Sequence, residues 1–211
     1  MDISHVEIEP GADADRETGV RMLASQGFNL VFGVGFLFTD AIKAVADDFP
    51  NTKFAIIDGF IPDKPNVSSM LFTEHEGSFL VGVIAGMKAK ADGKDTVGFV
   101  GGMDVPLIHK FEAGFKAGVQ NACPECKILS DYAGTTPSAF ADPVKGKELA
   151  LAQIDRGAYV IYHASGLTGA GVYEAGKERK VYVIGVDSNQ NHLGYDKETG
   201  KNYGLTSMLK Q

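Results

Sequence analysis

The chain has 211 residues, a formal net charge of -7 and 44% hydrophobic residues. That length accommodates one large domain or two small lobes, each with an ordinary buried core. The acidic balance argues against non-specific binding to nucleic acid, and no apolar run has the length of a membrane span. The first residues lack the basic patch and apolar core of a secretory signal.

Strand and helix patterns alternate along the first 91 residues. Short runs rich in β-branched residues predict strands over 3–8, 29–34, 53–57 and 67–72. Helical patterns run from Asp13 or Asp15 to residue 25, over 39–48 with Thr39 as the N-cap, and over 76–91. The last of these is rich in Gly and Ala, which permits close packing against a neighbour.

A charged, glycine-containing break at 91–95 is the predicted lobe boundary, and the alternation restarts after it. Strands are predicted over 96–100, 128–132, 159–162, 181–186 and 205–209. Helices are predicted over 106–121, which begins with Pro106, over 143–156, capped by Asp142, and over 169–177. Residues 189–202 form a polar turn. Two such series predict two similar α/β lobes, 1–91 and 92–204.

The strand at 205–209 has no helix after it to cover its face, as an α/β lobe normally has. We therefore expect a fragment of a longer protein, or a natural short form that relies on a partner.

Three predicted strands end in an aspartate: Asp58, Asp104 and Asp187. In an open α/β sheet, ligands bind outside the carboxyl ends of the strands. A carboxylate there accepts hydrogen bonds from hydroxyl or ring N–H groups of a polar ligand. Each aspartate taken alone could equally cap the next helix, and Asp104 is the best candidate for a cap. The three together favour a site for a small, hydroxyl-bearing molecule.

Three further residues follow or end predicted strands. Gly166 opens a glycine-rich turn that could present backbone N–H groups to a ligand, or be only a tight turn. Phe36 could face a cleft and stack on a ring, or belong to the core. His163 could hydrogen-bond a ligand or be satisfied locally.

Motifs of common enzyme classes are absent from the sequence. It has no P-loop, no G-x-S-x-G elbow and no H-E-x-x-H pair, and the glycines at 33–35 lack the third glycine of a dinucleotide fingerprint. The five histidines are scattered, so we expect neither a metal site nor a cofactor. Cys123 and Cys126 could form a local disulfide in an oxidising compartment or remain two reduced thiols.

Short motifs follow one another along nearly the whole chain: GVGFLFTDA at 33–41, FAIIDG at 54–59, EGSFLVG at 76–82, FVGGMDVPLI at 99–108, FEAGF at 111–115, KGKELA at 145–150, IGVDSNQ at 184–190 and LTSMLK at 205–210. In this order and spacing they resemble the basic membrane protein family, the PnrA-like group of bacterial substrate-binding lipoproteins. The resemblance implies a type I periplasmic-binding-protein fold, with two doubly wound α/β lobes, a ligand cleft between them, and a strand at 205–211 that crosses the hinge. Members deliver purine nucleosides to an ABC importer.

The resemblance also implies roles for individual residues. Asp187 would accept hydrogen bonds from the ribose hydroxyls. Lys210 would donate to the ribose and hold Asp187 ionised, which offsets the cost of burying a carboxylate. Asp58 would accept from ring N–H groups of the base. The further ligand contacts would be Gly166, Phe36, Asp104 and His163.

The chain departs from the family at both ends. Family members begin with a strand and helix that carry an Asp-x-Ser-Phe-Asn-like motif, and they continue beyond the LTSMLK strand. The expected function is an extracytoplasmic receptor, lipid-anchored in the full-length protein, that captures guanosine, adenosine or inosine for the permease subunits of an ABC transporter. One alternative is a ligand-sensing regulator of the same fold, as in Med-like relatives. The other is a nucleoside-processing enzyme, which the separation of the aspartates on different strands disfavours.

Overall fold

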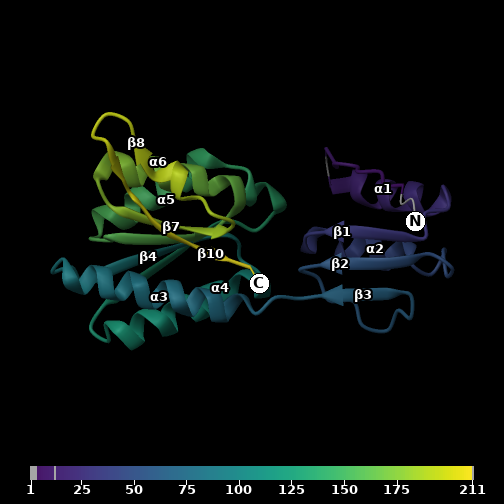
Figure 1. The fold of residues 1–211 in the computed structure, drawn as a ribbon, viewed down its shortest axis with the longest axis horizontal. Helices are drawn as coiled ribbons and strands as arrows, with labels where there is room; N and C mark the ends of the chain where they lie inside the picture. The colour runs from purple at the N-terminus through teal and green to yellow at the C-terminus, as the bar shows by residue number, and fades with distance from the viewer. Residues whose placement is uncertain (1–3, 12, 211) are drawn as a thin grey trace. The chain divides into compact units, whose positions relative to one another are not determined.

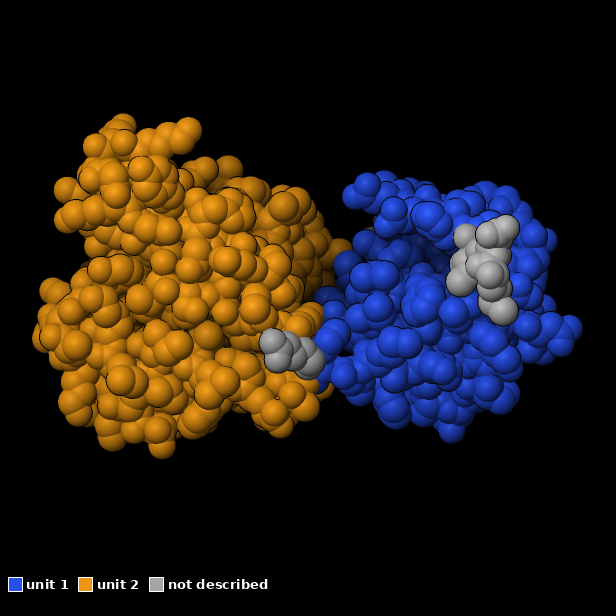
Figure 2. All heavy atoms as spheres, viewed as in Figure 1, with its two compact units in different colours: residues 1–72 blue, residues 73–211 orange. Residues whose placement is uncertain are grey.

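The computed structural model describes residues 4–11 and 13–210, and the chain forms two compact units. Unit 1 is Met1–Phe72 and unit 2 is Thr73–Gln211, coloured blue and orange in Figure 2. Within the described residues, no helix combines the length and the apolar character needed to cross a bilayer.

Unit 1 is built on a parallel sheet of three short strands. Its elements in chain order are α1 (Asp13–Ser25), β1 (Leu30–Val34), the 3-10 turn η1 (Phe36–Phe38), α2 (Thr39–Val45), β2 (Lys53–Ile57) and β3 (Val67–Met70). The strand order is β1-β2-β3 (Figure 1). The core joins α1 and α2 to the sheet through Val20, Ile42 and Phe54, all of which are buried. The helices and strands predicted from residue 13 onward in this unit are therefore present.

The strand predicted over 3–8 is wrong for the part of it that the structure describes, and residue 3 lies outside the described residues. Residues 4–10 have no regular secondary structure, and the described sheet of unit 1 consists of β1, β2 and β3. The segment lies near α1, where the side chain of Ile8 approaches Gly19. A strand exists only through hydrogen bonds to a neighbouring strand, which an apolar pattern alone does not supply.

The predicted cap of α2 is also wrong. Thr39 is the first residue of the helix, and its hydroxyl donates to the carbonyl oxygen of Phe36 at 2.6 Å. The N-cap position is Phe38, the last residue of η1, which makes no side-chain cap hydrogen bond. The 3-10 turn supplies the geometry that a capping side chain would otherwise provide.

Unit 2 is built on a parallel five-stranded sheet with the order β10-β7-β6-β4-β5 (Figure 1). Its strands are β4 (Thr96–Met103), β5 (Lys127–Gly134), β6 (Val160–Ala164), β7 (Tyr182–Asp187) and β10 (Gly204–Leu209). Its helices are α3 (Glu74–Ala91), α4 (Pro106–Ala122), α5 (Pro143–Asp155) and α6 (Gly169–Arg179). Each was predicted from the sequence with slightly different bounds, and the predicted cap of α5 is confirmed by Asp142, which accepts from the backbone N–H of Lys145 at 2.9 Å.

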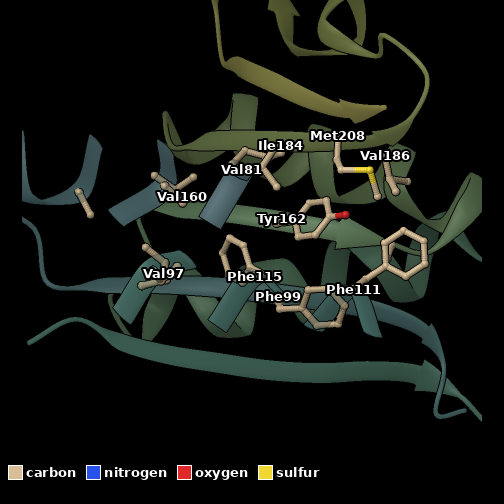
Figure 3. Packing of buried hydrophobic residues seen from close by; sticks show 14 of the residues in the cluster. Val81, Val97, Phe99, Phe111, Phe115, Val160, Tyr162, Ile184, Val186 and Met208 are labelled. Carbon is tan, nitrogen blue, oxygen red and sulfur yellow. The ribbon is translucent and has the colours of Figure 1, made fainter. Parts of the chain in front are cut away.

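Helices cover both faces of the sheet in unit 2. On the face that carries α3 and α4, the rings of Phe99, Phe115 and Tyr162 lie together (Figure 3). On the other face, α5 and α6 pack against Ile161 and Val183. A parallel sheet buries both faces in this way, so unit 2 is doubly wound, as predicted.

The backbones of α3 and α4 approach closely at glycines. A Cβ atom on Gly82 would lie 2.3 Å from the carbonyl oxygen of Phe115, and one on Gly118 would lie 2.0 Å from that of Phe79. The small residues of α3 therefore serve close packing, as predicted. This packing places α3 in unit 2, so the compact units divide between Phe72 and Thr73, ahead of the boundary predicted at 91–95.

The polar segment after β7 has more structure than the predicted turn. It contains the 3-10 turn η4 (Asn191–Gly194) and a small antiparallel hairpin of β8 (Tyr195–Asp196) and β9 (Lys201–Asn202). The hairpin turn is held by Asp196, whose carboxylate accepts from the backbone N–H of Glu198 and the hydroxyl of Thr199. Polar side chains, rather than an alternating apolar pattern, stabilise this hairpin, so its two strands carry no pattern that predicts them.

Cys123 and Cys126 form a disulfide at the end of α4. Of the two states that the sequence left open, the structure has the oxidised one. Cys123 is buried against α3, where a Cβ atom on Gly86 would meet its Cβ at 3.4 Å. The disulfide therefore belongs to the α3–α4 contact.

We expect Gly118→Ala to lower the free energy of unfolding of unit 2 by about 1–3 kcal/mol, because the added methyl group forces α3 and α4 apart. Urea unfolding followed by circular dichroism measures the change. Gly19→Ala in α1 is the matched control: its Cβ would meet Ile8 at an ordinary 3.6 Å, so we expect a gain of about 0.5–1 kcal/mol. Equal stabilities of the Gly118→Ala protein and the unaltered chain would contradict the close helix contact.

We expect reduction of the Cys123–Cys126 disulfide to cost about 2 kcal/mol of stability, because the bond closes only a short loop and so constrains the unfolded chain modestly. Thermal unfolding with and without reductant measures this. A Cys123→Ala/Cys126→Ala protein should show no response to reductant; a response there would mean that reductant acts elsewhere.

Candidate functional site

Polar side chains gather at the carboxyl ends of the strands in each unit. In an open parallel sheet this edge is where ligands bind. The residues predicted for a site that follow or end a strand are Phe36 and Asp58 in unit 1, and Asp104, Gly166, Asp187 and Lys210 in unit 2.

Asp187 and Lys210 form an ion pair at this edge of unit 2. Asp187 ends β7 and pairs in register with Leu209 of β10, so the next residue, Lys210, lies beside it. The Nζ of Lys210 is 3.3 Å from Oδ1 of Asp187. The lysine side chain is 16% exposed and the aspartate side chain 53% exposed, so the carboxylate remains open to a ligand. The lysine Nζ also lies 5.6 Å from the ring centroid of Phe111, a cation–π contact.

Asp58 and Phe36 lie at the corresponding edge of unit 1. The ends of β1 and β2 are tied together by the backbone N–H of Gly35, which donates to the carbonyl oxygen of Ile57 at 3.1 Å. Asp58 follows β2 directly, is partly buried, and donates its backbone N–H to the carbonyl oxygen of Met70 at 2.9 Å. Phe36 begins η1 and is also partly buried. The two ligand contacts predicted in unit 1 therefore come from adjacent strand ends.

Asp58 and Asp187 share an unusual backbone conformation. Their φ angles are +67° and +65°, in the left-handed region. Few residues other than glycine adopt it, although aspartate tolerates it better than most. Such conformations cluster at ligand sites, where they turn the chain sharply and aim a side chain. Both aspartates do this at the end of a buried strand.

Gly166 opens the 3-10 turn η3 (Gly166–Thr168) with φ +56°. A Cβ atom there would lie 3.0 Å from the carbonyl oxygen of Phe140, so the tight-turn interpretation is supported.

The sequence did not indicate Phe140, which ends the 3-10 turn η2 (Pro137–Phe140). Its ring packs over Gly102, where a Cβ atom would meet it at 2.3 Å. The paired glycines at the end of β4 are the signal that could have revealed an aromatic ring there.

Asp104 does not cap α4, so of the two interpretations left open for it the cap is wrong. The N-cap is Val105, which makes no side-chain cap hydrogen bond, and Pro106 begins the helix. Oδ1 of Asp104 instead lies 2.6 Å from Nε2 of His109, and about half of each side chain is exposed. The imidazole can reach back to the carboxylate because it lies in the first turn of the helix.

The imidazole of His109 lies edge-on to the ring of Tyr132. The hydroxyl of Tyr132 donates to the carboxylate of Glu112. Burial and the neighbouring Glu112 raise the pKa of Tyr132 above its usual value, so the phenol remains a donor. This polar chain keeps Asp104 and His109 at the sheet edge.

His163 lies inside unit 2 rather than at its surface. The imidazole is fully buried, with the Cα of Gly169 packed on its face and the ring of Tyr173 edge-on to it at 5.8 Å. Its Nδ1 lies 3.3 Å from Oγ of Ser165. Burial lowers the pKa of His163 to about 4, so the ring is neutral near pH 7. This geometry favours the local interpretation over direct contact with a ligand.

Among the described residues, no group of three or more His, Cys, Asp or Glu side chains is arranged to hold a metal ion. The polar groups described at the two sheet edges include carboxylates, a lysine, an imidazole and backbone amides. Such groups recognise hydroxyl and ring N–H groups of an organic ligand.

Comparison with known proteins identifies relatives of the whole chain. The family model described as "ABC transporter substrate-binding protein PnrA-like" matches residues 1–211. The chain is 38% identical over 214 residues to the CD4+ T-cell-stimulating antigen of Listeria monocytogenes, covering 97% of this chain and 58% of that protein. It is 37% identical over 209 residues to the ABC transporter nucleoside-binding protein BmpA of Lactococcus lactis, covering 94% of this chain and 58% of that protein. The chain thus spans less than two thirds of these relatives.

A solved structure confirms the fold class. The crystal structure of an ABC transporter system solute-binding protein from Aeropyrum pernix K1 matches with a TM-score of 0.78 and 32% identity, over 90% of this chain and 54% of that one. Together with the parallel sheets, this confirms the predicted type I periplasmic-binding-protein fold with two α/β lobes.

The buried His163 predicts a specific dependence of stability on pH. Its pKa is about 4 in the folded chain against 6.5 ordinarily, so the unfolded chain binds a proton more readily. The contribution of His163 to the free energy of unfolding is therefore at its maximum above about pH 6.5, and it falls by about 3 kcal/mol as the pH drops to about 4. Urea unfolding at a series of pH values measures the slope. His163→Leu should flatten it, whereas His192→Gln, an exposed control, should not; an unchanged slope in His163→Leu would contradict the assignment.

Proposed function

Because the chain belongs to the PnrA-like family of ABC transporter substrate-binding proteins, we propose that it binds purine nucleosides and delivers them to the permease subunits of an ABC importer. The observation that carries the proposal is the Asp187–Lys210 pair at the carboxyl ends of β7 and β10. An acceptor and a donor of opposite charge, side by side, match the vicinal hydroxyls of a ribose ring.

The pair suits a sugar because it offers a hydrogen-bond acceptor and a donor whose opposite charges stabilise each other. Asp187 accepts hydrogen bonds from the ribose hydroxyls. Lys210 donates to the ribose, and its positive charge offsets the cost of desolvating the carboxylate once a ligand excludes water. The lysine side chain is mostly buried, so little of its conformational freedom remains to be lost when a ligand binds.

The proposal assigns the contacts with the base to Asp58 and Phe36. Asp58 accepts from ring N–H groups, and Phe36 offers an aromatic surface from the next strand end. Gly166 and Asp104, at the strand ends of unit 2, complete the proposed set of contacts. His163 is fully buried, so its proposed part is to support the site from within the unit. The name of the Lactococcus lactis relative, a nucleoside-binding protein at 37% identity, supports nucleosides as the ligand class.

In this proposal the protein binds its ligand and does not convert it chemically. The family is described as one of ABC transporter substrate-binding proteins, which supports binding as the activity. Binding for an importer places the protein outside the cytoplasm. A relative from Pyrococcus abyssi is named an uncharacterized lipoprotein, which supports a lipid anchor in the full-length protein. We propose no nucleic-acid partner, in keeping with the net charge of -7.

Titration calorimetry with guanosine, adenosine and inosine tests the proposal. We expect saturable binding by the unaltered chain, and about a tenfold to hundredfold loss of affinity in Asp187→Asn, because a hydrogen bond to a charged group contributes about 1.5–3 kcal/mol. Lys210→Met keeps the apolar stem and should lose about tenfold. Free base released from inosine during the titration would indicate an enzyme instead.

The control uses an ion pair of the same residue types at the amino ends of the strands, away from the proposed site. Lys127 and Asp95 lie 3.9 Å apart at the start of β5 and just before β4, and both are exposed. Asp95→Asn and Lys127→Met should leave nucleoside affinity unchanged. Absence of nucleoside binding by the unaltered, cooperatively folded chain would refute the proposal for this chain.

A further inference from the structure

Three residues form a row across β6, β7 and β10 just beneath the proposed ribose contacts. Ser207 of β10 pairs in register with Gly185 of β7. Tyr162 of β6 pairs with Ile184 of β7, so the next residue in β6, His163, lies beside Gly185. The glycine in the middle of the row has no side chain, which leaves room between the imidazole and the serine hydroxyl.

The side chain of Gln190 fills this room. A Cβ atom on Gly185 would lie 2.8 Å from Cβ and Oε1 of Gln190 and 2.8 Å from Oγ of Ser207. Oε1 of Gln190 accepts from the backbone N–H of Val186 at 2.9 Å, and the backbone N–H of Gln190 donates to Oγ of Ser207 at 3.0 Å. One residue from the turn after β7 therefore binds both β7 and β10.

The same side chain lies beside the buried imidazole. Gln190 raises the pKa of His163, although burial outweighs it. The polar groups packed around the ring are Ser165 from the end of β6, Tyr173 from α6 and Gln190, all uncharged. Among the described residues, Nε2 of His163 makes no hydrogen bond of normal geometry. The ring is thus held neutral in a network that a new charge would disturb.

Asp187 lies inside the turn that Gln190 closes. The residue before it, Val186, donates its N–H to Gln190 and accepts at its carbonyl oxygen from the N–H of Ser188 at 2.7 Å. These bonds enclose the left-handed φ of +65° at Asp187. Ser207, bound to the backbone of Gln190, lies three residues before Lys210 on β10.

We propose that Gln190 is a positioning residue of the nucleoside site: it holds the turn at Asp187 and the strand that carries Lys210 in one arrangement, and couples both to the neutral imidazole of His163. The inference rests on the proposed function for its ligand. Gln190 itself touches no ligand and acts through the residues that do.

The test uses two variants of the chain with different expectations. Gln190→Leu removes the acceptor for Val186, so the backbone chemical shifts of Asp187 should lose their left-handed signature and nucleoside affinity should fall about tenfold. Gln190→Glu keeps an acceptor of the same shape, so Asp187 should retain that signature. Its carboxylate, placed beside the imidazole, should raise the pKa of His163, followed by NMR titration of the ring. Gln120, exposed on α4, provides the controls Gln120→Leu and Gln120→Glu, which should change none of these readouts.

Loss of the Asp187 signature in Gln190→Leu, its rescue in Gln190→Glu and a raised His163 pKa in Gln190→Glu would support the proposal. Unchanged Asp187 shifts in Gln190→Leu would overturn it, as would an unmoved His163 titration in Gln190→Glu. If the unaltered chain bound no nucleoside, the proposed function would fail for this chain. The Asp187 shifts and the His163 titration would still decide whether Gln190 positions the turn, because neither readout requires a ligand.

Discussion

The parallel pairing of β7 with β10 is the constraint on which the geometry of the candidate site depends. The register that sets Leu209 opposite Asp187 brings Lys210 to the carboxylate at 3.3 Å. A slip of one residue would turn every side chain of β10 to the other face of the sheet and remove the lysine from its partner. Because β7 is the one strand paired with β10 among the described residues, the register of β10 depends on side-chain contacts as well. Met208, 2% exposed in the core, supplies one of these.

The packing of the helices also determines the position of β10. A Cβ atom on Gly77 of α3 would lie 2.9 Å from Sδ of Met208, so the first turns of α3 rest directly on β10. The position of α3 is fixed in turn by its glycine contacts with α4, at Gly82 and Gly118. The close helix contact and the ion pair are therefore parts of one packed arrangement, and strain introduced at the helices would reach the sheet edge, because protein interiors do not deform freely.

The order of helices and strands from residue 13 onward could be predicted because apolar period and turn residues are local signals. The strand predicted over 3–8 was wrong, and the hairpin after β7 was not predicted. In both cases strand formation depends on a partner strand that a local pattern does not reveal. The same limit applied to the aspartates. Asp104 and Asp187 have nearly the same sequence context, a buried strand followed by a turn. Asp187 forms an ion pair with Lys210 because the strand order puts β10 beside β7. Asp104 instead contacts His109, which lies five residues later in the chain.

Backbone conformation separates a capping carboxylate from one aimed outward. A left-handed φ costs a residue with a side chain roughly 1–2 kcal/mol, so surrounding bonds must hold it. Lys180 also has a positive φ, but it ends α6, where a left-handed residue terminates the helix and needs no further explanation. Asp58 and Asp187 instead follow or end buried strands, and backbone hydrogen bonds to Met70 and within the turn at Val186 hold them there. A strained turn at the end of a strand holds the aspartate in one orientation. At Asp187 the side chain is 53% exposed, so a ligand can reach the carboxylate, and this fixed orientation is the physical reason to give these two aspartates the leading part in recognition.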